Sequence, residues 1–254
     1  MSPSIWTRCA ASSKGKPHRL VLKPFRVVES QYVVATRKLV DTDEEQAILE
    51  ALIDTVKPPI PVGMTHLHPL LFTPFRHPPL RWGSRFGTRS ERGLWYGSIA
   101  LPTAFAEVAY YRLVFLEGTR ADLSPITVEL SSFVASVDGK RGIELARPPF
   151  AAYEAQISSK TSYGDSQALG REMRAAGIDL FTFKSARDPH GGLNVALFNP
   201  CFSRARPTVP RTYVCTASRA NVDIARKDIL RRDREGYSFE RAVFEVGGKL
   251  PIPA

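Results

Sequence analysis

Hydrophobic positions along this chain follow two periods, one typical of strands and one typical of helices. β-Branched and aromatic residues gather at 20–37 and 125–137, which predicts strands. Apolar residues recur at helical spacing over 41–56, where Asp41 or Thr42 would cap a helix with an acidic first turn. The other predicted elements are strands at 93–98, 180–184 and 193–198, and helices at 102–116, 150–158, 166–176 and 221–234. The pattern at 237–250 does not settle an element type.

Prolines divide this pattern into segments. Pro58, Pro59 and Pro61 end the helix at 41–56. The prolines within the aromatic and basic stretch 66–87 predict short strands joined by turns. We therefore expect three parts, which are an N-terminal strand and helix extension (1–60), a core (61–210) and a C-terminal helical or mixed segment packed on that core (211–254). This mixture of elements predicts an α+β fold.

The helix predicted at 102–116 carries a carboxylate among its apolar side chains. Its stripe at helical spacing consists of Ala104, Glu107, Val108, Tyr111 and Phe115. Glu107 is therefore expected to point toward the core, where an unpaired charge would be costly. Arg85 and Tyr96 precede it at two equal intervals of eleven residues. Two explanations are open: the glutamate forms a structural pair with an arginine, or it is an active-site carboxylate with Arg85 and Tyr96 beside it.

Charge and cysteine content narrow the class of protein. Lysine and arginine number 35 against 25 acidic residues, and the net charge of +10 favours an anionic partner such as a nucleic acid or a phosphate-bearing ligand. Three widely spaced cysteines form neither a disulfide framework nor a zinc motif, which fits a reducing cytoplasm. The N-terminal residues show no secretory signal pattern. Glu107 and Arg112 interrupt the apolar run 99–116, so we expect a buried helix and no membrane span.

Two segments together resemble a known family. The pattern RFG…GLWYGS…TAFAEVAYYR, followed by FKSARDPHGGLNVALFNP, is similar to the RES family of bacterial toxins, named for an arginine, a glutamate and a serine. The resemblance implies an ADP-ribosyltransferase-like core, which is a split, mainly antiparallel sheet with flanking helices. It also implies that the substrate is NAD, whose nicotinamide–ribose bond these toxins cleave, and that a cognate antitoxin blocks the active site.

The resemblance assigns a role to each residue of these motifs. Arg85 would grip the pyrophosphate with its planar, charged fork, and Tyr96 would pack on the nicotinamide or its ribose. Glu107 would stabilise the oxocarbenium-like cation that forms on the ribose when the bond breaks. Ser185 would orient the ligand or the arginine by hydrogen bonding, since no His/Asp pattern marks it as a nucleophile. Asn194 matches the family pattern in a supporting role.

A second family arginine corresponds to Arg76. The interval from Arg76 to Arg85 is short, which leaves Arg81 as a substitute. The sequence contains no G-x-G-x-x-G and no P-loop motif. The resemblance does not require either motif, because arginine and polar side chains would hold the phosphates.

Other activities and partners stay open at this stage. The same chemistry with a different acceptor would make the protein an ADP-ribosyltransferase that modifies a protein target. A basic nucleic-acid-binding module is a further alternative, although the charged tail 225–235 lacks aromatic residues for base stacking. His66, His68 and His77 show no recognised ligand spacing, so no metal is expected. The expected partners are NAD and an antitoxin, and a protein acceptor and self-association are left open.

Overall fold

The computed structural model describes residues 3–30, 39–79, 81–121, 125–227 and 235–252. The helices are α1 (Ile5–Ala10), α2 (Asp43–Val56), α3 (Pro69–Arg76), α4 (Leu101–Gly118), α5 (Glu154–Ile157) and α6 (Gly164–Ala175), with 3-10 turns η1 (Ser13–Gly15), η3 (Phe150–Tyr153) and η4 (Arg241–Phe244). The strands are β1 (His18–Leu22), β2 (Phe25–Glu29), β3 (Trp95–Ser98), β4 (Ile126–Val134), β5 (Val137–Glu144), β6 (Leu180–Lys184), β7 (Leu193–Leu197), β8 (Arg211–Ala217), β9 (Asn221–Arg226) and β10 (Gly236–Glu240).

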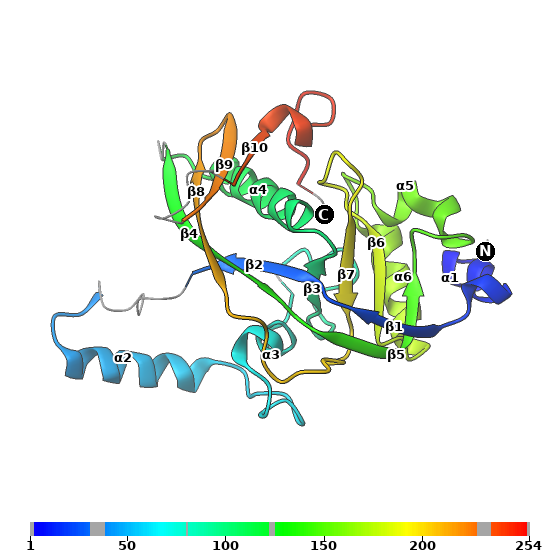
Figure 1. Ribbon diagram of the computed structural model, residues 1–254, viewed down its shortest axis with the longest axis horizontal. Coiled ribbons are helices and arrows are strands. Elements are labelled where there is room, and N and C mark those ends of the chain that lie inside the picture. The colour runs from blue at the N-terminus through cyan, green and yellow to red at the C-terminus, as the bar shows by residue number, and fades with distance from the viewer. Residues whose placement is uncertain (1–2, 31–38, 80, 122–124, 228–234, 253–254) are drawn as a thin grey trace.

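The strands of the described residues form one sheet in the order β1-β5-β6-β7-β3-β2-β4-β8-β9-β10 (Figure 1). β5 and β6 pair in parallel, and the other neighbours pair antiparallel. The predicted α+β class with a mainly antiparallel sheet is confirmed. β2 lies between β3 and β4, so the N-terminal part of the chain supplies a strand to the middle of the sheet.

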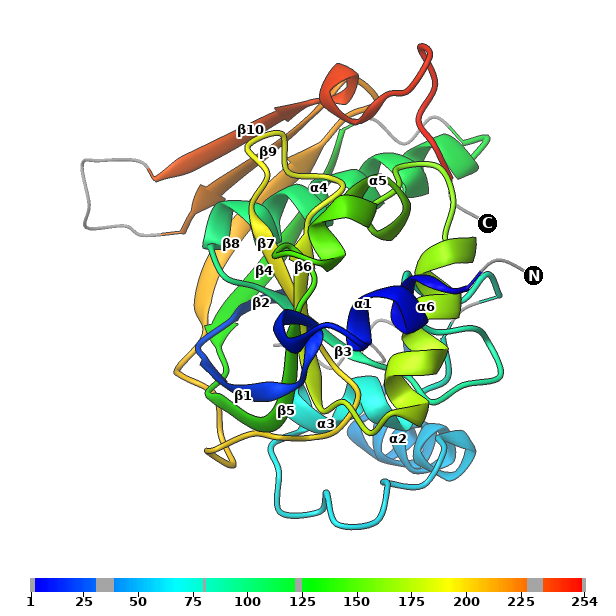
Figure 2. The same ribbon diagram turned by 90° about the vertical axis from the view of Figure 1, so that its right-hand side faces the viewer.

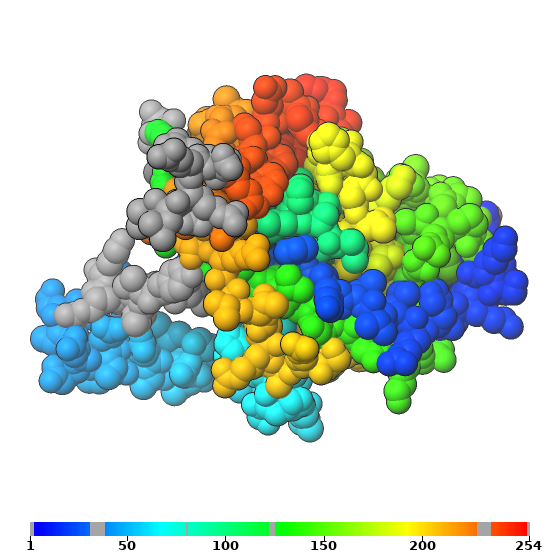
Figure 3. Space-filling view, viewed as in Figure 1, coloured from blue at the N-terminus to red at the C-terminus, as the bar shows by residue number. Residues whose placement is uncertain are grey.

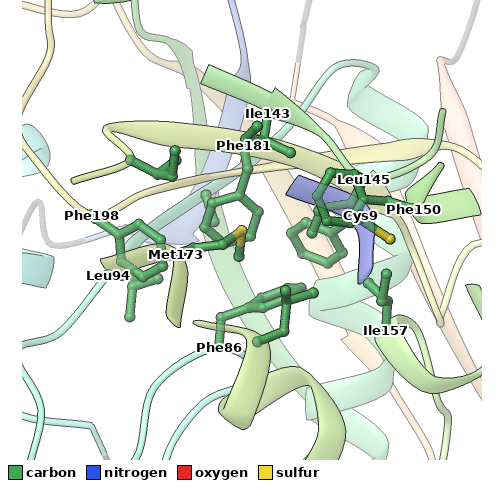
Figure 4. Packing of buried hydrophobic residues seen from close by; sticks show 14 residues of the cluster. Cys9, Phe86, Leu94, Ile143, Leu145, Phe150, Ile157, Met173, Phe181 and Phe198 are labelled. Atoms are coloured by element: carbon green, nitrogen blue, oxygen red, sulfur yellow. The ribbon is translucent and has the colours of Figure 1, made fainter. Parts of the chain in front are cut away.

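β6 and β7 are buried on both faces, which explains why their sequences read as continuous apolar runs. On β7, Val195 and Leu197 belong to one buried cluster, whereas Ala196 belongs to another together with Phe198, which directly follows the strand. The second cluster includes side chains from α1, α5 and α6, which cover this end of the sheet (Figure 2). Phe181 of β6 packs there against Phe86, which brings the chain around residue 85 onto the sheet (Figure 4).

α4 confirms the helix predicted at 102–116, but its buried face differs from the predicted stripe. The buried positions are Leu101, Thr103, Ala104, Phe105, Ala106, Ala109, Tyr110, Leu113 and Leu116. Tyr111 and Phe115, which were placed on the core stripe, are 57% and 56% exposed. That part of the prediction was wrong because the helix is apolar around most of its circumference, so periodicity alone could not select the face that packs on the sheet.

Two segments adopt a different element from the one predicted. The stretch 66–87 was expected to form short strands, but α3 occupies Pro69–Arg76, with Pro69 in its first turn and the Nδ1 of His68 accepting from Leu70 N at 3.2 Å. Pro at the first helical turn is favourable because its missing N–H has no intrahelical partner there. The helix predicted at 221–234 was also wrong where it can be compared, because Asn221–Arg226 forms β9, and 228–234 lies outside the described residues.

α2 confirms the helix predicted at 41–56. Thr42 caps it, and Thr42 and Glu45 form a reciprocal capping box. No residue of α2 is buried, and the helix extends away from the sheet (Figure 1). Within the described ranges, no helix has both the length and the apolar character needed to cross a membrane.

Candidate active site

Glu107 lies in the middle of α4, and hydrogen bonds from the β6–β7 hairpin fix its carboxylate. Its Oε1 atom accepts from Ser185 Oγ at 2.6 Å and from Asn194 Nδ2 at 2.6 Å. Ser185 directly follows β6 and Asn194 lies in β7, whereas Glu107 itself is only partly buried. Both bonds reach the same oxygen, and Oε2 has no hydrogen-bond partner among the described residues. The carboxylate is therefore held through one oxygen, and its second oxygen is left without a partner among the described residues.

Ser185 and Asn194, which donate to this carboxylate, are fixed by further hydrogen bonds. Ser98 Oγ donates to Asn194 Oδ1 at 2.7 Å, and the pairing of β3 with β7 sets Ser98 opposite Asn194. Ser185 Oγ accepts from the backbone N–H groups of Arg187 and Asp188, at 3.0 Å each. The lone pairs of the Ser185 hydroxyl are thus occupied while it donates to the carboxylate. This geometry orients the carboxylate and leaves the hydroxyl poorly placed to act as a nucleophile.

An ion pair does not explain the position of Glu107. None of the ion pairs within the described ranges includes Glu107, Arg85 or Arg187. The structure therefore does not support the explanation in which the glutamate forms a structural pair with an arginine. Hydroxyl and amide donors orient a carboxylate without neutralising its charge, which favours the alternative of a functional carboxylate.

Arg85 lies in a tight turn that leads into β3. Ser84 and Gly87 pair across this turn, and the Tyr96 hydroxyl hydrogen-bonds Ser84 Oγ at 3.0 Å and accepts from Phe86 N at 3.3 Å. Burial raises the pKa of Tyr96 to about 12, so this hydroxyl stays protonated well into the alkaline range. Tyr96 was predicted to pack on the substrate. That role stays a prediction, and the structure shows in addition that the Tyr96 hydroxyl fixes the turn that carries Arg85.

The guanidinium of Arg85 contacts a backbone segment between α5 and α6. Its Nη1 donates to the carbonyl of Ser159 at 2.8 Å and to that of Ile157 at 3.4 Å. The guanidinium also lies over the ring of Tyr163, 4.9 Å from its centroid. These contacts use part of a fork that has five N–H donors, so donors remain for a ligand.

Arg187 is a second guanidinium at this site, and the sequence motifs did not single it out. Its Nη2 donates to the carbonyl of Lys160 at 3.2 Å, and its guanidinium lies 3.6 Å from the ring centroid of Tyr110. The residue is 3% exposed, and its buried Nη1 has no hydrogen-bond partner among the described residues. Because Arg85 contacts the preceding carbonyl, that of Ser159, two cations lie along one short segment. Such a pair suits a doubly charged anion. The sequence signal that could have identified Arg187 is its position two residues after Ser185.

Two tyrosines of α4, three and four residues after Glu107, connect this helix to the two guanidiniums. The Tyr111 hydroxyl lies 3.5 Å from the Tyr163 hydroxyl, and the ring of Tyr163 contacts the Arg85 guanidinium. Burial raises the pKa of Tyr110 to about 12, and the charges of Arg187, Arg85 and the carboxylate all act on this hydroxyl. Both guanidiniums therefore lie near the turn of α4 that follows Glu107, Arg187 by contact with Tyr110 and Arg85 by contact with Tyr163.

This arrangement of an arginine, a glutamate and a serine agrees with the protein family that the sequence matches. The family model described as the RES domain matches residues 61–216, which is more than half of the 254 residues. The chain belongs to the RES domain family. RES domains are associated with toxin–antitoxin modules and with NAD. No curated protein matches the chain.

Within the RES domain, the contacts of Arg76 and Arg81, the two candidates for the second arginine, are to residues other than the carboxylate. Arg76 ends α3, and its Nε donates to the carbonyl of Pro58, in the segment after α2. Arg81 is exposed and stacks on the ring of Trp82 at 4.8 Å. No hydrogen bond or ion pair of the described residues joins either arginine to Glu107. Among the residues that the structure describes, no group of three or more His, Cys, Asp or Glu side chains could hold a metal ion.

Proposed function

We propose that this RES protein is an NAD-consuming toxin that cleaves the bond between nicotinamide and ribose. The observation that carries the proposal is the carboxylate of Glu107, which two neutral donors orient, one helical turn from the tyrosines that connect α4 to two guanidiniums. Both features suit cleavage of a dinucleotide, because its pyrophosphate is anionic and its reacting carbon becomes cationic.

The chemistry assigns Glu107 to the ribose. When the glycosidic bond breaks, its electron pair passes to the pyridinium ring, which leaves as neutral nicotinamide, and the ribose becomes an oxocarbenium-like cation. The negative charge of Glu107 stabilises that cation. Ser185 and Asn194 hold Oε1 beforehand, so the charge does not need to reorient as the cation forms. Water, phosphate or a protein side chain then captures the cation.

The pyrophosphate is assigned to Arg85 together with Arg187. Their guanidiniums contact the adjacent carbonyls of Ser159 and Lys160, so they can engage neighbouring phosphate groups. The unpartnered Nη1 of Arg187 supports this assignment, because a buried donor without a partner is costly unless a ligand satisfies it. In this proposal Arg187, and neither Arg76 nor Arg81, is the second arginine of the site.

The proposal is tested by mixing the purified protein with NAD and identifying the products by mass spectrometry. We expect nicotinamide and an ADP-ribose product. Glu107→Gln should reduce turnover by about 10²- to 10³-fold, as the loss of one preorganised electrostatic group does in other enzymes. It should fold, because glutamine keeps an oxygen that can accept from Ser185 and Asn194. Glu44→Gln is the matched control, because it makes the same charge change at an exposed side chain of α2, outside the site, and should leave turnover unchanged. Full activity in Glu107→Gln would remove the carboxylate from the mechanism.

The acceptor is identified with labelled NAD and a cell lysate. Label on free ADP-ribose or its phosphate supports degradation, whereas label on a protein band supports transfer to a protein target. The proposal also includes a cognate antitoxin as a protein partner. Its addition should stop NAD loss by the wild-type protein.

A further inference from the structure

The segment that follows the RES match covers one end of the active site. In the space-filling view, the orange-red C-terminal segment meets the yellow β6–β7 loop and the teal region around the start of α4 (Figure 3). The Tyr110 hydroxyl donates to the carbonyl of Pro251, and Lys160 Nζ donates to that of Val243 at 3.5 Å. Tyr110 and Lys160 also contact the Arg187 guanidinium. The C-terminal segment, residues 236–252, is therefore fastened to groups that hold the site.

A pocket of about 390 Å³ lies between this segment and the RES domain. Its lining includes Pro102, Asp188 and Pro189 on the RES side and Tyr237, Phe239 and Glu240 on the C-terminal side. The pocket adjoins the hydrogen bonds of the catalytic carboxylate, because the backbone N–H of Asp188 donates to Ser185 Oγ. Asp188 also fastens the loop to α4 by accepting from Thr103 Oγ1 at 2.7 Å.

The order of these features along α4 matches the order of groups in a nicotinamide dinucleotide. Pro102, in the pocket, precedes Glu107 by five residues, which is about 7.5 Å along the helix axis. Tyr110 and Tyr111, which connect to the two guanidiniums, follow Glu107 by three and four residues. Along α4, the pocket comes first, the carboxylate second and the guanidinium pair third. The substrate has its pyridinium ring, its ribose and its pyrophosphate in the same order.

We propose that this pocket, built jointly by the RES domain and the C-terminal segment, binds the pyridinium ring of the substrate. The inference rests on the proposed function and adds a subsite that residues outside the RES match complete. Tyr237 and Phe239 alternate along β10 and so share one face of the strand, and both pack against the cluster around α4. Aromatic faces attract a cation, and the carboxylates of Asp188 and Glu240 add negative potential. Bond cleavage removes the positive charge of the ring, so the same groups favour release of neutral nicotinamide.

The test uses ligands that separate the ring from the rest of the substrate. N1-methylnicotinamide is a pyridinium cation without ribose, nicotinamide is its neutral counterpart, and ADP-ribose lacks the ring. Each ligand is titrated by NMR into the wild-type protein, Phe239→Ala, Glu240→Gln and a control, Glu44→Gln. Glu44 lies on α2 and is exposed, and its variant makes the same charge change outside the pocket.

We expect the wild-type protein to bind N1-methylnicotinamide more tightly than nicotinamide. Phe239→Ala should weaken binding of the cation by about fivefold to thirtyfold, the range of a desolvated cation–π contact, and should leave ADP-ribose binding unchanged. Glu240→Gln, at an exposed side chain, should reduce the preference for the cation and provides the test if Phe239→Ala does not fold. Equal affinities of the wild-type protein and both pocket variants for the cation would overturn the inference, as would a wild-type protein that does not bind it. Failure of the proposed function would look different, because the cation would bind while NAD stayed intact.

Discussion

The hydroxyl of Tyr96 provides a sharp test of how the site is built. Tyr96→Phe removes the hydroxyl and keeps the ring, so a tyrosine that only packs on the substrate would tolerate the change. In the structure the hydroxyl hydrogen-bonds Ser84 Oγ and the N–H of Phe86, the residues on either side of Arg85. We therefore expect the variant to loosen the Arg85 turn.

The size of the effect follows from the burial of this turn. Phe86 is 0% exposed, so its N–H loses its partner in the interior when the hydroxyl is removed. An unsatisfied buried donor costs about 1–3 kcal/mol. For a chain of this size that loss corresponds to a fall in Tm of roughly 2–12 °C. If the loosened turn reduces the binding free energy between Arg85 and the substrate by about 1.4 kcal/mol, KM for NAD rises about tenfold. The value of kcat should change little, because Glu107 keeps its own partners.

Thermal unfolding and steady-state NAD turnover measure the two effects. Tyr153→Phe is the matched control, because Tyr153 packs against the same core cluster and its hydroxyl makes no hydrogen bond to the described residues. It should keep the wild-type Tm and KM. Wild-type values in Tyr96→Phe would refute the reasoning and would favour direct packing of the ring on the substrate. A fall in kcat with unchanged KM would also contradict it.

Two further predictions concern the same turn and its surroundings. A Cβ at Gly170 of α6 would lie 2.2 Å from the Phe86 carbonyl oxygen, so Gly170→Ala should destabilise the protein by about 1–3 kcal/mol and raise KM. Gly164→Ala in the same helix, where the nearest atom is 3.7 Å away, should do neither, and equal denaturation midpoints for the two variants would contradict the packing argument. The pKa values of Tyr96 and Tyr110 are raised to about 12, so the folded state favours the protonated hydroxyls. Their contribution to stability should be complete below pH 10 and should be lost as the pH rises toward 12. Urea unfolding across this range should show a shallower decline for Tyr96→Phe, and equal slopes would contradict the assignment.

Local sequence signals were sufficient for the elements that carry the site. Pro102 in a first helical turn and the apolar run behind it predicted the helix that bears Glu107, and glycine and aromatic residues predicted the strand that bears Tyr96. Both signals act within a few residues, and here the tertiary contacts of α4 and β3 agree with them. The prediction for 66–87 was wrong because its prolines were taken to favour short strands joined by turns, whereas Pro69 occupies a first helical turn and Pro74 is tolerated inside α3.

The C-terminal segment shows where competing signals misled the interpretation. Val222 and Ile224 alternate with exposed residues in β9, which is a strand period. The charged run that follows pointed to a helix, and pairing with β8 and β10 decided the outcome. Neither the wrap of this segment over α4 nor the contacts of Arg187 could be read from the pattern, because they join positions far apart in the chain.

The sequence alone therefore determined the α+β class, the helix with a carboxylate in its apolar surface and the family to which those motifs belong. The tertiary structure decided which groups meet that carboxylate. Ser185 and Asn194 lie 78 and 87 residues from Glu107 in the chain, and only the packing of α4 against the β6–β7 hairpin brings them within 2.6 Å. Hydrogen bonds over such separations depend on strand register and helix packing, which are properties of the whole fold.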